Sequence, residues 1–249
     1  MQRVEVLSLG SVPYRECWQL QRRRAALCWD TGVGTVIFVE HPPVVTLGRA
    51  GRRSGLVVSE AELAAAGVDL VHSDRGGDVT YHGPGQLVVY PILNLALWRK
   101  DVHRYFRALE EATLQTLLDF GIHGHRSPLG SGVWARHPET GSAKIASLGV
   151  HLSRWITSHG LALNVCNPLE PFSRIVPCGL SGVTMTSISS LLCRPVSRAA
   201  AEERLWTHLV AEFDLLPVES MAGGRAAEWE SGGAGEWESG GAGEWESRA

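Results

Sequence analysis

Three strand-like segments follow one another in the second half of the chain, with no helix-length segment between them. They are rich in apolar and β-branched residues and cover residues 132–135, 144–152 and 156–165. Ser153-Arg154-Trp155 alone separates the second from the third, so we expect a tight turn and an antiparallel pair. Strands clustered in this way argue against a strict alternation of strands and helices around a parallel sheet.

Further strands and helices are predicted on either side of this cluster. The other strands are expected at Val4–Leu9, Thr35–Val39 and Gln86–Leu95. Helices are expected at residues 13–29, 59–67, 101–121 and 198–213, the second beginning at a capping box of Ser59 and Glu62. Pro91 lies inside a predicted strand and indicates an edge strand or a bulge. The predicted fold class is α+β, with helices packed on a mixed or antiparallel sheet.

The composition is that of an ordinary globular protein, with 44% hydrophobic and 20% charged residues in 249. Apolar runs stay well short of the roughly 18 to 20 residues that a membrane helix needs. The first residues carry no basic flank followed by an apolar run, so we expect a cytoplasmic protein with no membrane partner. Five cysteines, without a CxxC pair or zinc-like spacing, favour reduced thiols and predict no metal site.

The last 27 residues differ from the rest of the chain. Residues 223–249 repeat the pattern Glu-Trp-Glu-Ser among glycines and hold six Glu and two Arg, a net charge of −4. Subtracting them leaves 21 basic and 20 acidic residues, a net charge of +1 that predicts no nucleic-acid partner. We therefore predict a folded domain over residues 1–222 and a disordered tail over 223–249. The alternative is a tail that docks through its tryptophans.

A glycine-rich segment is the first candidate for a ligand-binding site. It reads Arg75-Gly-Gly-Asp-Val-Thr-Tyr-His-Gly-Pro-Gly-Gln86, with four glycines in twelve residues. Glycines let a backbone approach a ligand closely or expose its N–H groups. The segment matches neither GK[ST] nor GxGxxG, so it is no known phosphate loop. Arg, Thr, Tyr and His among the glycines favour a binding loop over a simple turn.

Lys144 opens the otherwise apolar strand Lys144–Leu152. A buried ammonium is costly unless it has a partner, and the alternative is a lysine that reaches solvent. The small residues Ala146, Gly149, Gly160 and Ala162, on this strand and the next, leave room for a slot that an acyl chain fits.

Cys178 lies between Pro177 and Gly179, a context that predicts an irregular turn and a well-presented thiol. A thiol with a pKa of about 8.5 is only a few per cent thiolate at pH 7. A cation beside it would lower that pKa, and Lys144 is the candidate, although the sequence does not place the two side by side.

These segments together resemble the octanoyltransferase (lipoyl(octanoyl) transferase) family of lipoate biosynthesis. The similarity covers Glu40 to Leu191, and the blocks RGGDVTYHGPGQ, KIASLGV, HGLALNV and PCG carry it by their order and spacing. The resemblance implies the catalytic-domain fold of biotin- and lipoate-protein ligases, with Cys178 as the acyl-thioester nucleophile, Lys144 as the lysine that tunes it, and no cofactor. The substrate-binding residues that it implies are Arg75, Gly76, Gly77, Asp78, Val79, Thr80, Tyr81, His82, Ser147, Leu148, Gly149, Gly160, Leu161 and Ala162.

The implied reaction moves an octanoyl group from octanoyl-acyl carrier protein, through the cysteine, to a lysine of a lipoyl domain. Implied acceptors are the lipoyl domains of 2-oxoacid dehydrogenase complexes and the glycine cleavage H protein. Lys144 is favoured as the general base, with His82 as a binding or orienting group. Oxyanion donors are expected near Cys178 and in the Gly76–Gly77 loop.

Two alternatives remain open at the level of function. One is an ATP-dependent lipoate-protein ligase, which needs no nucleophilic cysteine. The other is an inactive relative that binds only acyl groups or lipoyl domains. Arg49, Arg52 and Arg53 form either a solvated basic loop or a docking patch for an acidic carrier protein.

Overall fold

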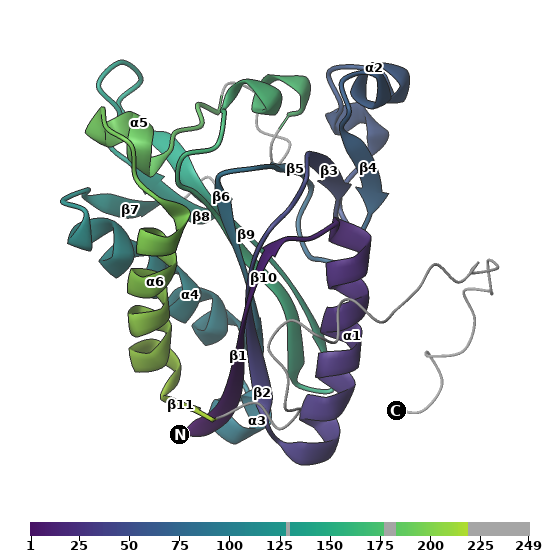
Figure 1. The fold of residues 1–249 in the computed structure, drawn as a ribbon, viewed down its shortest axis with the longest axis vertical. Helices are drawn as coiled ribbons and strands as arrows, with labels where there is room; N and C mark the ends of the chain where they lie inside the picture. The colour runs from purple at the N-terminus through teal and green to yellow at the C-terminus, as the bar shows by residue number, and fades with distance from the viewer. Residues whose placement is uncertain (128–129, 177–182, 219–249) are drawn as a thin grey trace. The chain divides into compact units, whose positions relative to one another are not determined.

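The computed structural model describes residues 1–127, 130–176 and 183–218, all within a unit that covers Met1–Glu219. Its main feature is an eight-stranded mixed sheet in the order β11-β1-β2-β6-β10-β9-β8-β7 (Figure 1). The strands are β1 (Gln2–Ser11), β2 (Gly34–Glu40), β6 (Gln86–Ile92), β7 (Gly124–Ser127), β8 (Gly130–Ala135), β9 (Ala143–Ser153), β10 (Ile156–Asn164) and β11 (Leu215–Pro217). The pairs β11–β1 and β1–β2 are parallel and the others antiparallel, as predicted for an α+β fold.

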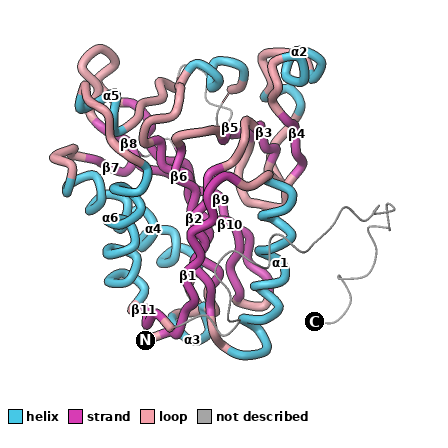
Figure 2. Tube along the Cα trace, viewed as in Figure 1, coloured by secondary structure: helices cyan, strands magenta, loops and turns pink. Residues whose placement is uncertain are grey.

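A second sheet has three strands in the order β4-β3-β5, near one end of the large sheet (Figure 2). Its strands are β3 (Val44–Leu47), β4 (Asp69–His72) and β5 (Val79–His82). Residues 75–86 are expected to form a binding loop, and the formation of β5 inside this segment corrects that expectation. Pairing with β3 explains why a strand forms here. Val79 and Tyr81 of β5 are buried in the same hydrophobic cluster as Val45 and Leu47 of β3.

Helices cover both faces of the large sheet. They are α1 (Tyr14–Thr31), α2 (Glu60–Ala65), α3 (Leu95–Trp98), α4 (Val102–Asp119), α5 (Ile188–Leu192) and α6 (Arg198–Phe213), with 3-10 turns η1 (Arg53–Gly55) and η2 (Glu170–Arg174). The predicted capping box of Ser59 and Glu62 is present at the start of α2. The side chain of Asp101 caps α4 by accepting the Arg104 N–H at 3.0 Å.

The core lies on the two faces of the sheet because side chains alternate along each strand. In β2, Val36 and Phe38 belong to the larger hydrophobic cluster, which α4 and α6 cover. Ile37 and Val39 belong to a second cluster on the other face, which α1 covers. Figure 1 shows α4 and α6 on one side of the sheet and α1 on the other.

Pro91 does not mark an edge strand, and that prediction is wrong. β6, which contains it, lies between β2 and β10 inside the large sheet. Pairing between β6 and β10 runs from Gln86 to Val89 and stops before Pro91, so the missing N–H lies beyond that ladder. The Pro91 carbonyl accepts hydrogen bonds from the Thr157 hydroxyl at 2.7 Å and the Tyr105 hydroxyl at 3.2 Å.

Candidate active site

A pocket with about 580 Å³ of space between atoms, part of it open to solvent, lies against β9, β10, β5 and the start of α1. Of the residues predicted from the sequence, it brings together Arg75, Gly77, Asp78, Val79, Thr80, His82, Lys144, Ser147, Leu148, Gly149, Gly160, Leu161 and Ala162. The Tyr81 ring packs instead on Phe172 at 5.4 Å, and the Gly76 N–H donates to Val150 O at 2.8 Å.

Paired small residues on β9 and β10 form one wall of the pocket. Gly149 lies opposite Gly160, and Ser147 opposite Ala162, in the antiparallel register. A Cβ on Gly160 would collide with the Val89 carbonyl of β6, so glycine is required for this close approach of strands. Ala146, predicted to line the same slot, belongs to the large hydrophobic cluster instead, because its side chain lies on the opposite face of β9.

Arg75 fixes the loop that carries Gly77 and Asp78. Its Nε and Nη2 donate to Thr46 Oγ1 at 3.0 and 2.9 Å, and Nη2 also donates to Thr46 O at 2.7 Å. Nη1 donates to Gly76 O at 3.1 Å and Nη2 to Asp78 O at 2.6 Å. These oxygens compensate the buried guanidinium, so its charge holds the loop against β3.

The loop that contains Arg49, Arg52 and Arg53 is hydrogen-bonded to the segment of residues 75–78. Backbone N–H groups of residues 48–50 donate to carbonyls of residues 75–78 at 2.9 to 3.1 Å. Arg49, Arg52 and Arg53 are exposed, and Arg53 forms an ion pair with Glu60 at 3.0 Å. The loop therefore borders the residues that line the pocket.

Lys144 is buried at the start of β9, with 2% of its surface exposed, which excludes the alternative that it reaches solvent. Its Nζ lies 5.9 Å from the centre of the Trp134 ring. Gly132 makes room for it, since a Cβ there would lie 2.7 Å from Lys144 Cε. Cys178 lies outside the described residues, and its pairing with Lys144 stays a prediction.

The floor of the pocket is a cluster of aromatic rings, the histidine–tyrosine cluster, formed by Tyr14, His41, His82, Tyr90 and His159. Tyr14 lies nearly parallel to His82 and to His159, with ring centres 5.8 and 6.5 Å apart. His41 and Tyr90 join it through edge contacts and a hydrogen bond of 2.8 Å between His41 Nε2 and the Tyr90 hydroxyl. Tyr14, His82, Tyr90 and His159 line the pocket directly.

Two histidines of the cluster have tautomers that their partners fix. His41 Nδ1 lies 2.6 Å from Val12 O, a carbonyl that only accepts, so Nδ1 carries the proton and Nε2 accepts from Tyr90. His159 Nε2 lies 2.7 Å from Asp74 Oδ1 and donates to it, which leaves Nδ1 to face the Tyr14 hydroxyl at 3.4 Å. Burial lowers the pKa of His41 to about 4, so it stays neutral at pH 7.

His159 also has an unusual backbone conformation for a residue inside a strand. Its φ of 57° is in the left-handed region, and its N–H donates to Gln21 Oε1 at 2.7 Å. Backbone strain of this kind is common at functional sites.

Asp74, the hydrogen-bond partner of His159, has a lowered pKa. Burial opposes the charge on Asp74, but the hydrogen bond and charge of His159, with the charges of His151 and Arg22, outweigh burial and lower the Asp74 pKa.

Comparison with known proteins supports the identity that the sequence blocks indicate. Residues 13–210 match the lipoyl protein ligase A/B catalytic domain. The chain is 45% identical over 224 residues to the octanoyltransferase of Chloroflexus aggregans, covering 89% of this chain and 100% of that protein. This chain belongs to the octanoyltransferase family. As a member, it is an acyltransferase that acts in octanoyl or lipoyl transfer.

Solved structures show the same fold at low sequence identity. A bipartite lipoate protein ligase of Thermoplasma acidophilum superimposes with a TM-score of 0.70 at 16% identity, covering 88% of this chain and 87% of that one. The biotin protein ligase of Aquifex aeolicus gives a TM-score of 0.52 at 12% identity, covering 86% and 71%. The predicted ligase-like catalytic fold is therefore confirmed.

Several residues of the octanoyltransferase pocket are absent from the sequence-based set: Tyr14, Val88, Tyr90, Ser131 and His159. His159 stands directly before Gly160 in a predicted apolar strand, and a histidine among apolar residues is the signal that the sequence offers. Tyr14 begins a helix far along the chain from the other pocket residues and carries no local signal.

Within the part of the chain that the structure describes, no group of three His, Cys, Asp or Glu side chains is arranged to hold a metal ion. Over the same residues, no helix combines the length and the apolar character that crossing a membrane requires.

Proposed function

We propose that this octanoyltransferase takes the octanoyl group of octanoyl-acyl carrier protein onto Cys178 and passes it to a lysine of a lipoyl domain. The observation that carries the proposal is the pocket itself. It combines a wall of small residues, Gly149, Gly160 and Ala162, with the buried amine-bearing side chain of Lys144.

The described residues on either side of Cys178 are tied to the same region. Val176, two positions before it, donates its N–H to Gly55 O at 2.8 Å. Thr184, six positions after it, accepts the Lys144 N–H at 2.8 Å. The six positions between Cys178 and Thr184 correspond to at most roughly 20 Å of extended chain, a limit compatible with the proposal of Cys178 as the nucleophile and Lys144 as its cationic neighbour.

In the first step, the Cys178 thiolate attacks the donor's thioester carbonyl, a sulfur–carbon bond forms, and the carrier's thiolate leaves and takes up the proton of the Lys144 ammonium, which leaves Lys144 neutral for the second step. One thioester replaces another, so the step needs no ATP. In the second step, the acceptor amine attacks the acyl-enzyme, forms an amide and releases the Cys178 thiolate. The amine must lose its proton, and Lys144 in its neutral form is the proposed base.

His82 is less suited to be that base. Burial, followed by the charges of His41 and Arg75, holds its pKa well below the usual value. Proton transfer from an ammonium to such an imidazole is strongly uphill, so we assign His82 a binding or orienting role. Of the Gly76–Gly77 pair, the Gly76 N–H already bonds Val150 O, which makes the Gly77 N–H the candidate oxyanion donor.

The proposed partners follow from this chemistry. The donor carrier docks on the exposed loop of Arg49, Arg52 and Arg53 beside the pocket, and the acceptors are lipoyl domains of 2-oxoacid dehydrogenase complexes and the glycine cleavage H protein. The reaction is proposed to take place in the cytoplasm, in a catalytic domain of residues 1–222. The likeness of the fold to lipoate protein ligases keeps ATP-dependent ligation as the second candidate.

The test is intact-mass analysis after exposure to an octanoyl donor without ATP, for the wild type, Cys178→Ser and Lys144→Ala. We expect an octanoyl adduct on the wild type, none on Cys178→Ser, and a slowed adduct on Lys144→Ala. A ligase would form no adduct and would retain most ATP-dependent activity as Cys178→Ala. A protein that forms no adduct and has no activity with ATP would be an inactive relative.

A further inference from the structure

A chain of side-chain hydrogen bonds runs from His82 in the pocket to the strand that carries Lys144. His82 Nδ1 lies 2.8 Å from Gln86 Oε1. Gln86 Nε2 donates to Tyr81 O at 3.2 Å and to Asn164 Oδ1 at 2.9 Å. Asn164 Nδ2 in turn donates to Thr186 O at 3.0 Å.

The direction of every bond in this chain is determined by its two backbone carbonyls. Tyr81 O and Thr186 O can only accept, so the NH₂ groups of Gln86 and Asn164 must face them. Gln86 Oε1 is then an acceptor, and the His82 nitrogen that faces it must carry a proton. Neutral His82 is therefore protonated on Nδ1, which leaves the lone pair on Nε2.

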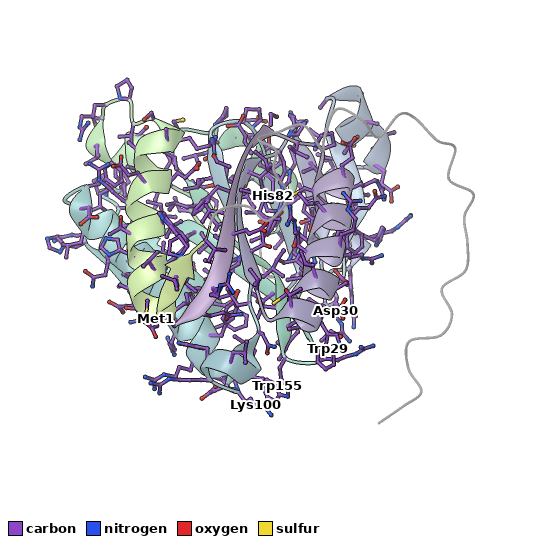
Figure 3. The ribbon with its side chains drawn as sticks, turned by 60° about the horizontal axis from the view of Figure 1, so that its bottom comes forward. Met1, Trp29, Asp30, His82, Lys100 and Trp155 are labelled. Atoms are coloured by element: carbon purple, nitrogen blue, oxygen red, sulfur yellow. The ribbon has the colours of Figure 1, made fainter. Side chains whose placement is uncertain are left out.

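Burial makes this arrangement stringent. Gln86 is 2% exposed, Asn164 1% and His82 5%, so water does not compete for their polar groups. Nε2 of His82 lies 3.5 Å from Thr46 Oγ1, a distance at which a hydrogen bond is weak, so Nε2 keeps its capacity to accept from a ligand. Figure 3 shows His82 inside the molecule, away from the end where Trp29, Lys100 and Trp155 lie.

The far end of this series of hydrogen bonds reaches the backbone of Lys144, the residue proposed as the base. Thr186 donates its N–H to Lys144 O at 2.9 Å, and Lys144 donates its N–H to Thr184 O at 2.8 Å. One network thus fixes the backbone of Lys144 and the ring of His82, although the two residues are far apart in sequence.

The charges around His82 favour the same neutral form. Burial lowers the His82 pKa most, repulsion by His41 in its protonated form and by Arg75 lowers it further, and His159 adds a smaller contribution of the same sign. Tyr14 stacks on the ring, and burial raises the pKa of Tyr14 to about 12, so it contributes no negative charge at pH 7.

We propose that Gln86 and Asn164 are positioning residues that hold His82 as a neutral acceptor, with Nε2 available to the incoming amine of the acceptor lysine. The tautomer follows from the contacts alone, whereas the role toward the amine rests on the proposed function. His82 then orients the amine by accepting one of its protons in a hydrogen bond, while the transferred proton goes to Lys144.

The tautomer can be measured in the resting full-length protein by NMR with ¹⁵N-labelled histidine. The His82 resonances are assigned by their loss in His82→Gln. We expect the Nδ1–H tautomer throughout pH 6 to 8.5, the form less common for free histidine. Observation of the Nε2–H tautomer or of a doubly protonated ring in this range would overturn the proposal.

Gln86→Glu tests the positioning role, with Gln19→Glu, the same change at an exposed site of α1, as the matched control. A carboxylate facing Nδ1 stabilises the imidazolium, so the His82 titration midpoint should rise by about one unit or more. The control should leave the midpoint unchanged. Equal midpoints in wild type and Gln86→Glu would refute the role. If Gln86→Glu does not fold, Asn164→Asp provides a second readout: its carboxylate can still accept from Gln86 Nε2, so the Nδ1–H tautomer of His82 should persist, and loss of that tautomer would refute the proposal.

Single-turnover kinetics test the step that depends on the proposed function. At a pH below the raised His82 midpoint of Gln86→Glu, transfer from acyl-enzyme to lipoyl domain should be about tenfold slower than in the wild type at the same pH, because a doubly protonated ring cannot accept a hydrogen bond from the amine. Acylation of Cys178 by the donor should change much less. Equal slowing of both steps would refute the role of His82 toward the amine. If the wild type forms no acyl-enzyme, the proposed function fails, while the NMR result on Gln86 still stands.

Discussion

Replacing His41 with Gln should make the fold less sensitive to acid. His41 is fully buried, and burial lowers its pKa from 6.5 to about 4. Between these two values the unfolded chain binds a proton at this position that the folded protein does not, so stability falls as the pH drops. This pKa shift lowers the free energy of unfolding by about 2 kcal/mol between pH 7.5 and 5, and by about 3 kcal/mol at pH values well below 4.

The assay is urea unfolding at pH 7.5, 6 and 5 for the wild type and His41→Gln. A glutamine can donate to Val12 O and accept from the Tyr90 hydroxyl, as the imidazole does, but it does not titrate. The variant is expected to be less stable than the wild type at pH 7.5. Between pH 7.5 and 5, its free energy of unfolding should fall by about 2 kcal/mol less than that of the wild type. Equal losses in both proteins would show that His41 is not held neutral by burial.

Three further predictions concern the strands, the slot and the arginine loop. Gly160→Ala should lower the free energy of unfolding by about 2 kcal/mol or more, because the added Cβ collides with β6. The control is Gly10→Ala, whose added Cβ has no atom within 4 Å and should therefore lower it less; urea titration measures both. Hexanoyl donors should acylate the enzyme roughly 15-fold less efficiently than octanoyl donors, since two methylenes contribute about 1.6 kcal/mol, and equal rates with hexanoyl and dodecanoyl donors would contradict a closed slot. KM for the carrier-bound donor should rise with salt in the wild type but not after Arg49, Arg52 and Arg53 are all replaced by Ala. If the salt effect persists in the triple variant, these arginines are a solvated loop and do not dock the carrier.

Local rules predicted much of the fold. The S-x-x-E box at Ser59 and the cap at Asp101 gave helix starts that the structure confirms, because the capping hydrogen bonds form within the first turn of the helix itself. Pro91 failed as an edge signal because the absent N–H matters only where a neighbouring strand is still paired, and that depends on the length of the β6–β10 ladder. Strand β5 was missed because its pairing with β3 comes from outside the segment.

The site was predictable to the extent that its residues lie in compact blocks. The segments at residues 75–82, 147–149 and 160–162 carry most of the pocket-lining residues that sequence reasoning named. Tyr14 and Tyr90 do not stand out locally, since their importance comes from ring contacts with His159 between α1, β6 and β10. The position of Cys178 relative to Lys144 stays a prediction.

If the pocket binds an octanoyl chain as proposed, the hydrogen bonds of the histidine–tyrosine cluster explain how it can also contain several polar rings. His41, His82 and His159 all have lowered pKa values, first through burial, and each has a ring nitrogen that donates to a fixed acceptor. With these protons used internally, the nitrogens that remain are acceptors, and Arg75 nearby opposes any further positive charge. Such a floor disfavours a protonated amine but can accept a hydrogen bond from a neutral one. In the proposed reaction this favours the acceptor lysine in the form that attacks the thioester.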